Sequence, residues 1–117
     1  MATLTKMALS GSTNGKNIKI TANVIGSAVT IHAAQVGTSN FDEIWLWAVN
    51  TSSSDVALTI AYGGVSDPDD FIVNTIPAKS GFILILPGII LQNELIVKAF
   101  AATANVINVN GFVNRIG

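Results

Sequence analysis

The strongest constraint in this sequence is a period-two alternation of apolar and polar residues, in short runs that end at turn-forming residues. The cleanest run covers residues 17–23, where Ile18, Ile20 and Ala22 fall on one side of an extended chain and polar residues fall on the other. Clusters of Gly, Ser, Asn and Asp separate such runs about every eight to twelve residues. This spacing predicts a β-sandwich with strands that are buried on one face.

We expect an all-β fold, because no region of helical length carries a capped 3.6-residue period. The 117 residues predict one domain, with residues 1–16 as a candidate extended N-terminal arm. We predict a single-domain antiparallel β-sandwich, jelly-roll-like, of about eight to nine strands; an immunoglobulin-like sandwich and a small closed barrel are the alternatives. The expected strands cover residues 4–9, 17–23, 28–33, 43–50, 55–62, 71–76, 82–86, 94–101 and 106–114.

The same alternation predicts which side chains face inward. In residues 55–62 the inward set is Val56, Leu58, Ile60 and Tyr62, and the outward set is Asp55, Ala57, Thr59 and Ala61. Residues 43–50 and 82–86 are apolar on both faces, so their second face needs a cover from outside one small sandwich. In residues 106–114 an amide-rich face carries Asn108, Asn110, Phe112 and Asn114.

Composition supports burial between subunits. Charged residues make up 11% of the chain, against roughly 25% in an average soluble domain, and mean hydropathy is +0.55. The longest apolar run, residues 82–91, is half the ~20 residues of a membrane helix and contains Pro87, so we predict no membrane span. We also expect no signal peptide. The surplus apolar surface is therefore expected in a well-filled core or against other subunits.

Charge and cysteine content exclude several classes of partner and site. A formal charge of −1 gives no electrostatic basis for binding nucleic acid or an anionic membrane. Without cysteine the chain has no disulfide, no Cys-based zinc site and no thiol nucleophile. The glycines of residues 11–16 precede a strand and have the wrong spacing for a phosphate loop, so we interpret this segment as a turn.

The single histidine, His32, is the first candidate for chemistry. A catalytic role would need a nucleophile to activate and a carboxylate to orient the ring, and no neighbouring residues offer that pair. In residues 28–33 the alternation puts His32 on one strand face with Ala28 and Thr30. A structural or interface histidine is the favoured interpretation, and we predict no enzyme activity.

Three carboxylates in one turn, Asp67, Asp69 and Asp70, are the weak candidates for a metal site. Calcium binds several oxygen ligands from flexible turns, but this loop lacks the closing Glu of an EF-hand. The three are also too close in sequence to flank a sugar as the acid and base of a glycosidase. A solvated turn is favoured, and we expect no metal and no cofactor.

Two tryptophans, Trp45 and Trp47, project from the same face of an expected strand. Together with Tyr62 they could form a stacking platform for a sugar ring. Core or interface packing is the favoured interpretation, because no polar cluster for sugar hydroxyls lies beside them in the sequence. The candidate oligomer or capsid interface comprises Trp45, Trp47, Phe82, Ile83, Leu84, Ile89, Ile90, Asn108 and Asn110.

Four stretches carry a resemblance to a known group of proteins. They are residues 40–51 (NFDEIWLWAVNT), 67–70 (DPDD), 76–81 (IPAKSG) and 99–111 (AFAATANVINVNG). In general sequence character they resemble small structural virion proteins of tailed bacteriophages, in particular capsid decoration, or cement, proteins. The resemblance extends over about the last three quarters of the chain and includes no catalytic motif.

The resemblance implies a jelly-roll-like homotrimer on the capsid surface, made in the host cytoplasm, that bridges subunits of the major capsid protein. Such a protein has no active site and acts through buried apolar area, about 1,600 Å² at an ordinary subunit junction. A carbohydrate-binding module and a structural protein of the tail or the head-to-tail junction remain as alternatives.

Overall fold

A computed structural model describes residues 3–117 and places nearly all of the regular structure in strands. Only a short 3-10 turn, η1 (Ile25–Ser27), interrupts them. The strands are β1 (Leu4–Ala8), β2 (Ile18–Lys19), β3 (Val29–Ala33), β4 (Phe41–Asn50), β5 (Val56–Tyr62), β6 (Phe71–Ile76), β7 (Ile83–Leu91), β8 (Ile96–Ala101) and β9 (Ile107–Ile116). The all-β prediction is confirmed. Within the described residues no helix is long and apolar enough to cross a membrane.

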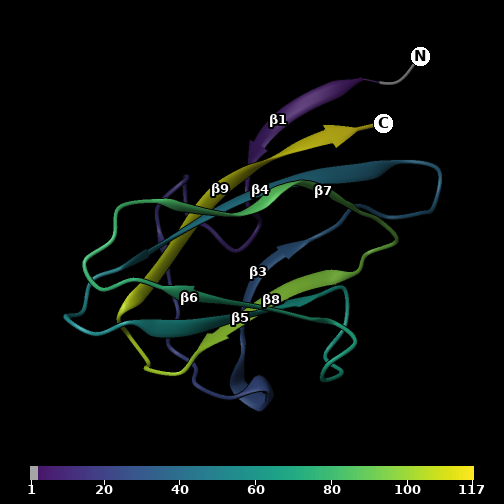
Figure 1. Ribbon diagram of the computed structural model, residues 1–117. Coiled ribbons are helices and arrows are strands. Elements are labelled where there is room, and N and C mark those ends of the chain that lie inside the picture. Colours follow the sequence, from purple (N-terminus) through teal and green to yellow (C-terminus); the bar gives the residue numbers. More distant parts are fainter. Residues whose placement is uncertain (1–2) are drawn as a thin grey trace.

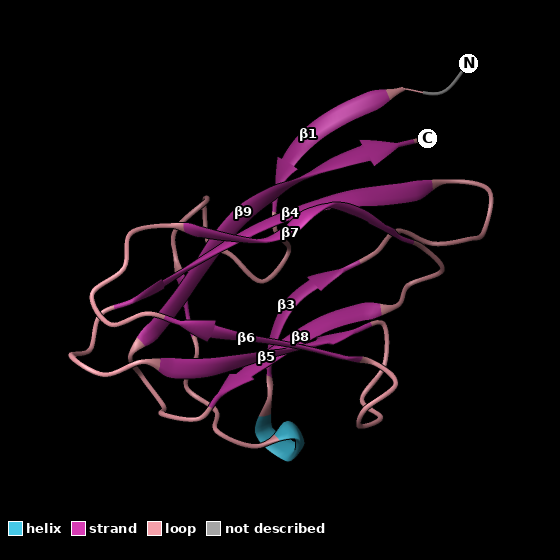
Figure 2. Ribbon diagram, in the orientation of Figure 1, coloured by secondary structure: helices cyan, strands magenta, loops and turns pink. Residues whose placement is uncertain are grey.

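The strands form two antiparallel sheets that pack face to face (Figures 1 and 2). One sheet has the order β1-β9-β4-β7, with β2 also paired to β9, and the other has the order β3-β8-β5-β6. The pairs β2·β9, β3·β8, β4·β7 and β5·β6 are nested one inside the next along the chain. A long antiparallel ribbon rolled into two sheets has this order, so the fold is a jelly-roll sandwich, as the sequence predicted.

The core lies between the sheets and follows the predicted alternation. On β4 the even-numbered residues Ile44, Leu46 and Ala48 are buried, and on β9 the buried set is Ile107, Val109 and Val113. These side chains pack against Leu58 and Ile60 of β5 and against residues of β8. Burying a Leu or Ile side chain stabilises the fold by about 1.5–3 kcal/mol, so this layer is the main source of stability.

Three local predictions are wrong. Strand β7 continues through Pro87 and Gly88 to Leu91, because it is an edge strand and tolerates a proline and irregular pairing. Thr59 and Ala61, expected on the outward face, are buried beside neighbours on β6 and β8. The strand expected over residues 17–23 shortens to β2, although Ile20 and Ala22 still enter the core.

The expected N-terminal arm is partly an ordinary strand. Residues Leu4–Ala8 form β1, which pairs with the last part of β9 over five residue pairs, from Leu4↔Ile116 to Ala8↔Phe112. The first two residues of the expected arm, 1–2, lie outside the described residues. The start of β1 and the end of β9 therefore lie side by side at one end of the sandwich (Figure 1).

Candidate functional site

The outer face of the β1-β9-β4-β7 sheet carries a cluster of three aromatic rings, Trp45, Trp47 and Phe112. Trp45 and Phe112 are direct neighbours across β4 and β9, and Trp47 lies two residues along β4. Each pair of ring centroids is 6.0–6.1 Å apart, with planes inclined by 14–26°. All three side chains are half-buried. Of the two environments predicted for these tryptophans, core and interface, the core is wrong, because the opposite face of β4 fills the core.

Polar and charged neighbours fix the orientation of these rings. The Trp45 indole Nε1 donates to Glu43 Oε1 at 2.8 Å, and the Asn114 amide donates to the same oxygen at 3.1 Å. The hydrogen bond from Trp45 is the main reason why the pKa of Glu43 lies below its usual value, and the hydrogen bond from Asn114 acts in the same direction. The Lys6 ammonium lies 4.3 Å from the centroid of the Phe112 ring, a cation–π contact.

Glycine gives Trp45 its place on the sheet. A Cβ on Gly88 of β7 would lie 2.8 Å from the six-membered ring of Trp45, so the indole occupies the space above this residue. Gly88 also has a φ of 75°, which glycine adopts without strain. The Pro87-Gly88 break in the apolar run thus leaves room for an indole while the strand continues.

A shallow hollow of about 240 Å³ lies beside the aromatic cluster. It is lined by Trp47, Phe82, Asn110, Gly111 and Phe112. The Asn110 amide nitrogen donates to Gly15 O at 3.0 Å and to Asn17 Oδ1 at 2.9 Å, and its oxygen accepts from the Gly111 N–H at 2.7 Å. Because Asn110 is occupied by its own chain, the hollow presents mainly apolar surface.

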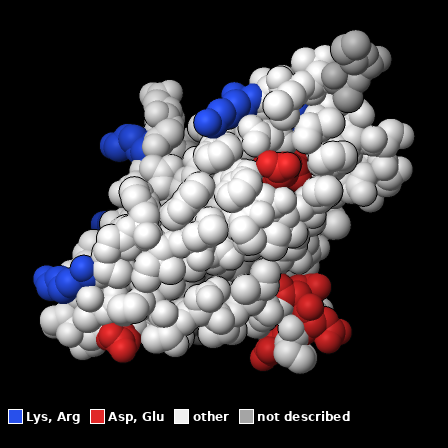
Figure 3. Space-filling model, turned by 45° about the horizontal axis from the view of Figure 1, so that its top comes forward, with Lys and Arg blue, Asp and Glu red and all other residues white. Residues whose placement is uncertain are grey.

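Further apolar side chains extend this surface to the β7 edge. Phe82, Leu84 and Ile90 are exposed by 59%, 45% and 52%. Ile89 pairs with the buried Ile44 and therefore lies on the inner side of the sheet, at its edge. Ile83, by contrast, is half-buried and packs against the core, whereas Asn108 and Asn110 lie half-buried on the outer face of β9. In Figure 3, which brings the top of Figure 1 forward, a broad uncharged area separates the few charged side chains. We call the outer surface formed by Trp45, Trp47, Phe112, Phe82 and Leu84 the aromatic face.

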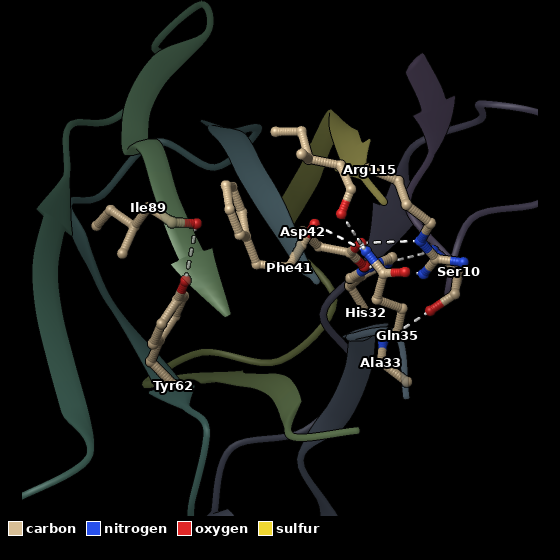
Figure 4. Close-up of polar contacts among 10 residues, drawn as sticks. Ser10, His32, Ala33, Gln35, Phe41, Asp42, Tyr62, Ile89 and Arg115 are labelled. Atoms are coloured by element: carbon tan, nitrogen blue, oxygen red, sulfur yellow. Dashed lines mark hydrogen bonds and ion pairs between the residues drawn. The ribbon is translucent and has the colours of Figure 1, made fainter. Parts of the chain in front are cut away.

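A buried polar network occupies the inner side of the same sheet. His32 Nε2 lies 2.7 Å from Asp42 Oδ2, and both side chains are fully buried. Arg115 forms a bidentate ion pair with the same carboxylate, in which Nε donates to Oδ1 and Nη2 donates to Oδ2, each at 2.8 Å. The Gln35 amide adds a contact of 3.3 Å to Asp42 Oδ1. Figure 4 shows these side chains converging on Asp42.

The hydrogen bonds of His32 define its role. The Ser10 backbone N–H donates to Nδ1 at 2.9 Å, so Nδ1 is an acceptor and the neutral ring carries its proton on Nε2, which donates to Asp42. A serine nucleophile would have to donate its hydroxyl to the ring. Ser10 Oγ instead accepts from the Ala33 N–H at 2.8 Å. Ser10, His32 and Asp42 therefore form a structural link between loop, β3 and β4.

Opposing effects act on the pKa of Asp42. Burial by itself raises this pKa, but the hydrogen bonds from Arg115 and His32, together with the positive charge of Arg115, outweigh burial and lower it. The same pair raises the pKa of Arg115 through its hydrogen bond to Asp42. The carboxylate is therefore held in its charged form.

The sequence analysis missed this network for a local reason. A register shift between Thr30 and His32 in the β3·β8 pairing turns both Ile31 and His32 inward, so the predicted face of His32 is wrong. Asp42 and Arg115 are 73 residues apart and meet because β4 pairs with β9. Both residues also lie just outside the expected strands, 43–50 and 106–114, so the alternation assigned neither of them a face.

Two further candidate groupings are the sugar platform, which was an alternative to packing, and the acidic loop, for which we expect no metal. Tyr62 belongs to the other sheet, and its hydroxyl donates to Ile89 O at 3.0 Å, so it does not join Trp45 and Trp47 in a sugar platform. Burial raises its pKa to about 12.

In the acidic loop Asp67 and Asp69 are exposed, and Asp70 accepts from the Ser66 N–H at 3.0 Å. Among the described residues no three His, Cys, Asp or Glu side chains are grouped to hold a metal.

Comparison of the chain with protein-family models, with curated proteins and with solved structures finds no match. The functional conclusion therefore depends on the surface and the interior described above.

Proposed function

We propose that the protein is a non-enzymatic structural virion protein, an outer capsid decoration protein that trimerises and bridges subunits of the major capsid protein. The single observation that carries this proposal is the aromatic face. Soluble monomers seldom leave stacked tryptophans beside a row of exposed Phe, Leu and Ile without a partner. A subunit junction of ordinary size removes about 800 Å² per partner, and an open sheet face of this kind can supply it.

The interior supports a structural role. The polar residues that look most like catalytic groups, His32 and Asp42, are fully buried and occupied by Ser10 and Arg115. A reacting group must reach its substrate, whereas these groups contact only the protein's own chain. Their geometry holds loops and strands together, which suits a protein that acts by remaining folded.

A bridging protein needs a second surface, and one is present at the loop end of the sandwich. A hollow of about 250 Å³ is lined by residues of the loop after β5 and the start of β8. Val36, Val65 and Leu95, all exposed, lie in loops near this end. We assign the aromatic face to contact between copies and this end to the capsid.

The proposal is tested first by mass in solution. Light scattering of the 12.2 kDa chain is expected to give a trimer at micromolar concentration, and Trp47→Ser combined with Leu84→Ser is expected to give smaller species. Val36→Ser is the matched control, because Val36 is also exposed but lies away from the aromatic face. A monomeric wild-type protein would contradict self-association.

The capsid assignment needs a separate experiment. The purified protein is mixed with shells of the major capsid protein of the proposed virion and sedimented. We expect saturable binding that stabilises the shells against heat. Fractionated particles separate the alternatives, because a tail or junction protein would remain with the tails and not with the heads.

One observation favours a carbohydrate-binding module as second candidate: the three aromatic planes are nearly parallel, and two of the rings, Trp47 and Phe112, line a hollow. Flat rings of this kind stack on the apolar side of a sugar. Tryptophan fluorescence that shifts on titration with neutral oligosaccharides, and no longer shifts in Trp47→Ser, would support this candidate over self-association.

A further inference from the structure

The two sheets leave open edges at β1 with β2 and at β7 in one sheet, and at β3 and β6 in the other. An open edge presents unpaired N–H and C=O groups, and proteins usually protect it with charge, proline or a bulge. Strands β1 and β2 carry Lys6 and Lys19. Strand β7 contains Pro87 and two register shifts, and β3 contains one shift. Each of these edges is therefore blocked against pairing.

Strand β6 (Phe71–Ile76) has none of these features within its own residues. Its sequence, FIVNTI, contains no charge and no proline, and it pairs with β5 over six consecutive residues without a shift. Val73 is 60% exposed. Segments of this kind, β-branched and uncharged at an open edge, pair readily with another strand.

The hydrogen-bond pattern between β5 and β6 shows which backbone groups of β6 are free to bond with another strand. The Tyr62 N–H donates to Asp70 O at 2.8 Å, so the alternation of an antiparallel pair directs the even-numbered residues of β6 toward β5. The N–H and C=O groups of Val73 and Thr75 then point away from the sheet. An odd-numbered residue of β6 and an odd-numbered residue of a second β6 can therefore lie opposite each other and exchange two backbone hydrogen bonds, as in an antiparallel sheet.

We propose that β6 pairs antiparallel with β6 of a second copy across a twofold axis, which joins the two β3-β8-β5-β6 sheets into one. The charges that flank the strand favour this partner. Asp67 and Asp69 precede β6, and Lys79 follows it. Antiparallel self-pairing brings the acidic loop of each copy beside Lys79 of the other, whereas parallel pairing would place acidic loop beside acidic loop.

This contact goes beyond the proposed trimer, because it uses the edge of one sheet and leaves the aromatic face of the other sheet free. It gives the acidic loop a function that requires no metal. An isologous contact of this kind closes on itself, so it joins copies in pairs. If trimers form through the aromatic face, the β6 contact links two neighbouring trimers.

Cysteine capture tests the pairing directly, because the chain has no cysteine of its own. Val73→Cys and Thr75→Cys are oxidised separately and as a mixture, with Val36→Cys as an exposed control outside β6. We expect a covalent dimer from Val73→Cys alone or from its mixture with Thr75→Cys, according to register. Capture no faster than with Val36→Cys in all of these samples would overturn the proposal, whereas a dimer from Thr75→Cys alone would place the twofold axis at Thr75.

Charge variants test the same contact without oxidation. Val73→Lys puts like charges opposite each other. Above the micromolar range, where we expect wild-type trimers to pair through β6, this variant is expected to remain trimeric and to keep a melting curve like that of Val36→Lys. Lys79→Glu is expected to weaken the association about tenfold at low salt. An unchanged mass for Val73→Lys would overturn pairing through β6, and an unchanged affinity for Lys79→Glu would overturn its antiparallel direction.

Discussion

The two sides of strands β4 and β9 differ in how far their side chains are paired and buried within the chain. On the inner side Asp42 and Arg115 form an ion pair, and no buried side-chain N or O atom in residues 3–117 lacks a hydrogen-bond partner. On the outer side Trp45 and Phe112 stack but remain half-exposed. Neighbouring residues of one strand thus differ in their surroundings: the inner side fills the core, and the outer side leaves apolar rings partly exposed.

The largest expected effect comes from breaking the inner side. Asp42→Ala removes the acceptor of His32 Nε2–H and of Arg115 while the imidazole stays buried. Removing one member of a buried ion pair costs about 3–5 kcal/mol, and we expect the free energy of unfolding to fall by that amount. Urea denaturation measures it. Asp69→Ala, at an exposed site, is the control, and a loss in Asp42→Ala as small as the control's would contradict a structural network.

This comparison also shows what the sequence could predict. The alternation in residues 43–50 and 106–114 predicted which side chains share a face of β4 and of β9, because both strands are regular. The inner network was not predictable in detail. The shift at Thr30 and His32 depends on pairing with β8, and the meeting of Asp42 with Arg115 depends on the β4·β9 register.

The aromatic face was predictable only as a set of alternatives. Spacing placed Trp45 and Trp47 on one side of a strand, but which side faced the core depended on the neighbouring strands. The contribution of Phe112 and the place of Gly88 beneath Trp45 required the tertiary structure. Pro87 and Gly88 were interpreted as the end of a strand, because local sequence does not reveal that β7 lies at an edge.

Acid should weaken the inner side by a smaller amount, since a protonated carboxyl still forms some hydrogen bonds. The pKa of Asp42 is lowered in the folded protein, so its stabilisation is present above its unfolded value of 3.8 and is lost as the pH falls through the folded value. We expect the melting temperature to drop below about pH 4. Asp42→Asn should start less stable and show a shallower drop, and an equally steep drop would assign the acid response to other carboxyls.

On the outer side, truncation should cost less stability but more association. Trp47 is half-buried, so Trp47→Ala is expected to cost about 1–2 kcal/mol, below the 3–5 kcal/mol of a core aromatic residue. Leu46→Ala, the inward neighbour, should cost about 2–5 kcal/mol and leave the oligomeric state of the folded fraction unchanged. Association with other subunits also raises the apparent stability. Denaturation at low protein concentration, where subunits dissociate, therefore measures the loss of folding stability alone. A Trp47→Ala protein that keeps the wild-type mass would remove the aromatic face from the subunit contact.

The smallest expected effect concerns the acidic loop, where we predict that calcium leaves the melting temperature unchanged. Asp67 and Asp69 are exposed, and Asp70 is engaged by the Ser66 N–H, so solvent and the backbone already moderate their repulsion. A cation that binds only the folded state must raise stability by mass action. Melting with added calcium and with a chelator measures this difference. A calcium-dependent rise of more than a few degrees, abolished by Asp69→Asn, would make the loop a metal site and would replace Lys79 of a second copy as the counter-charge that we propose for it.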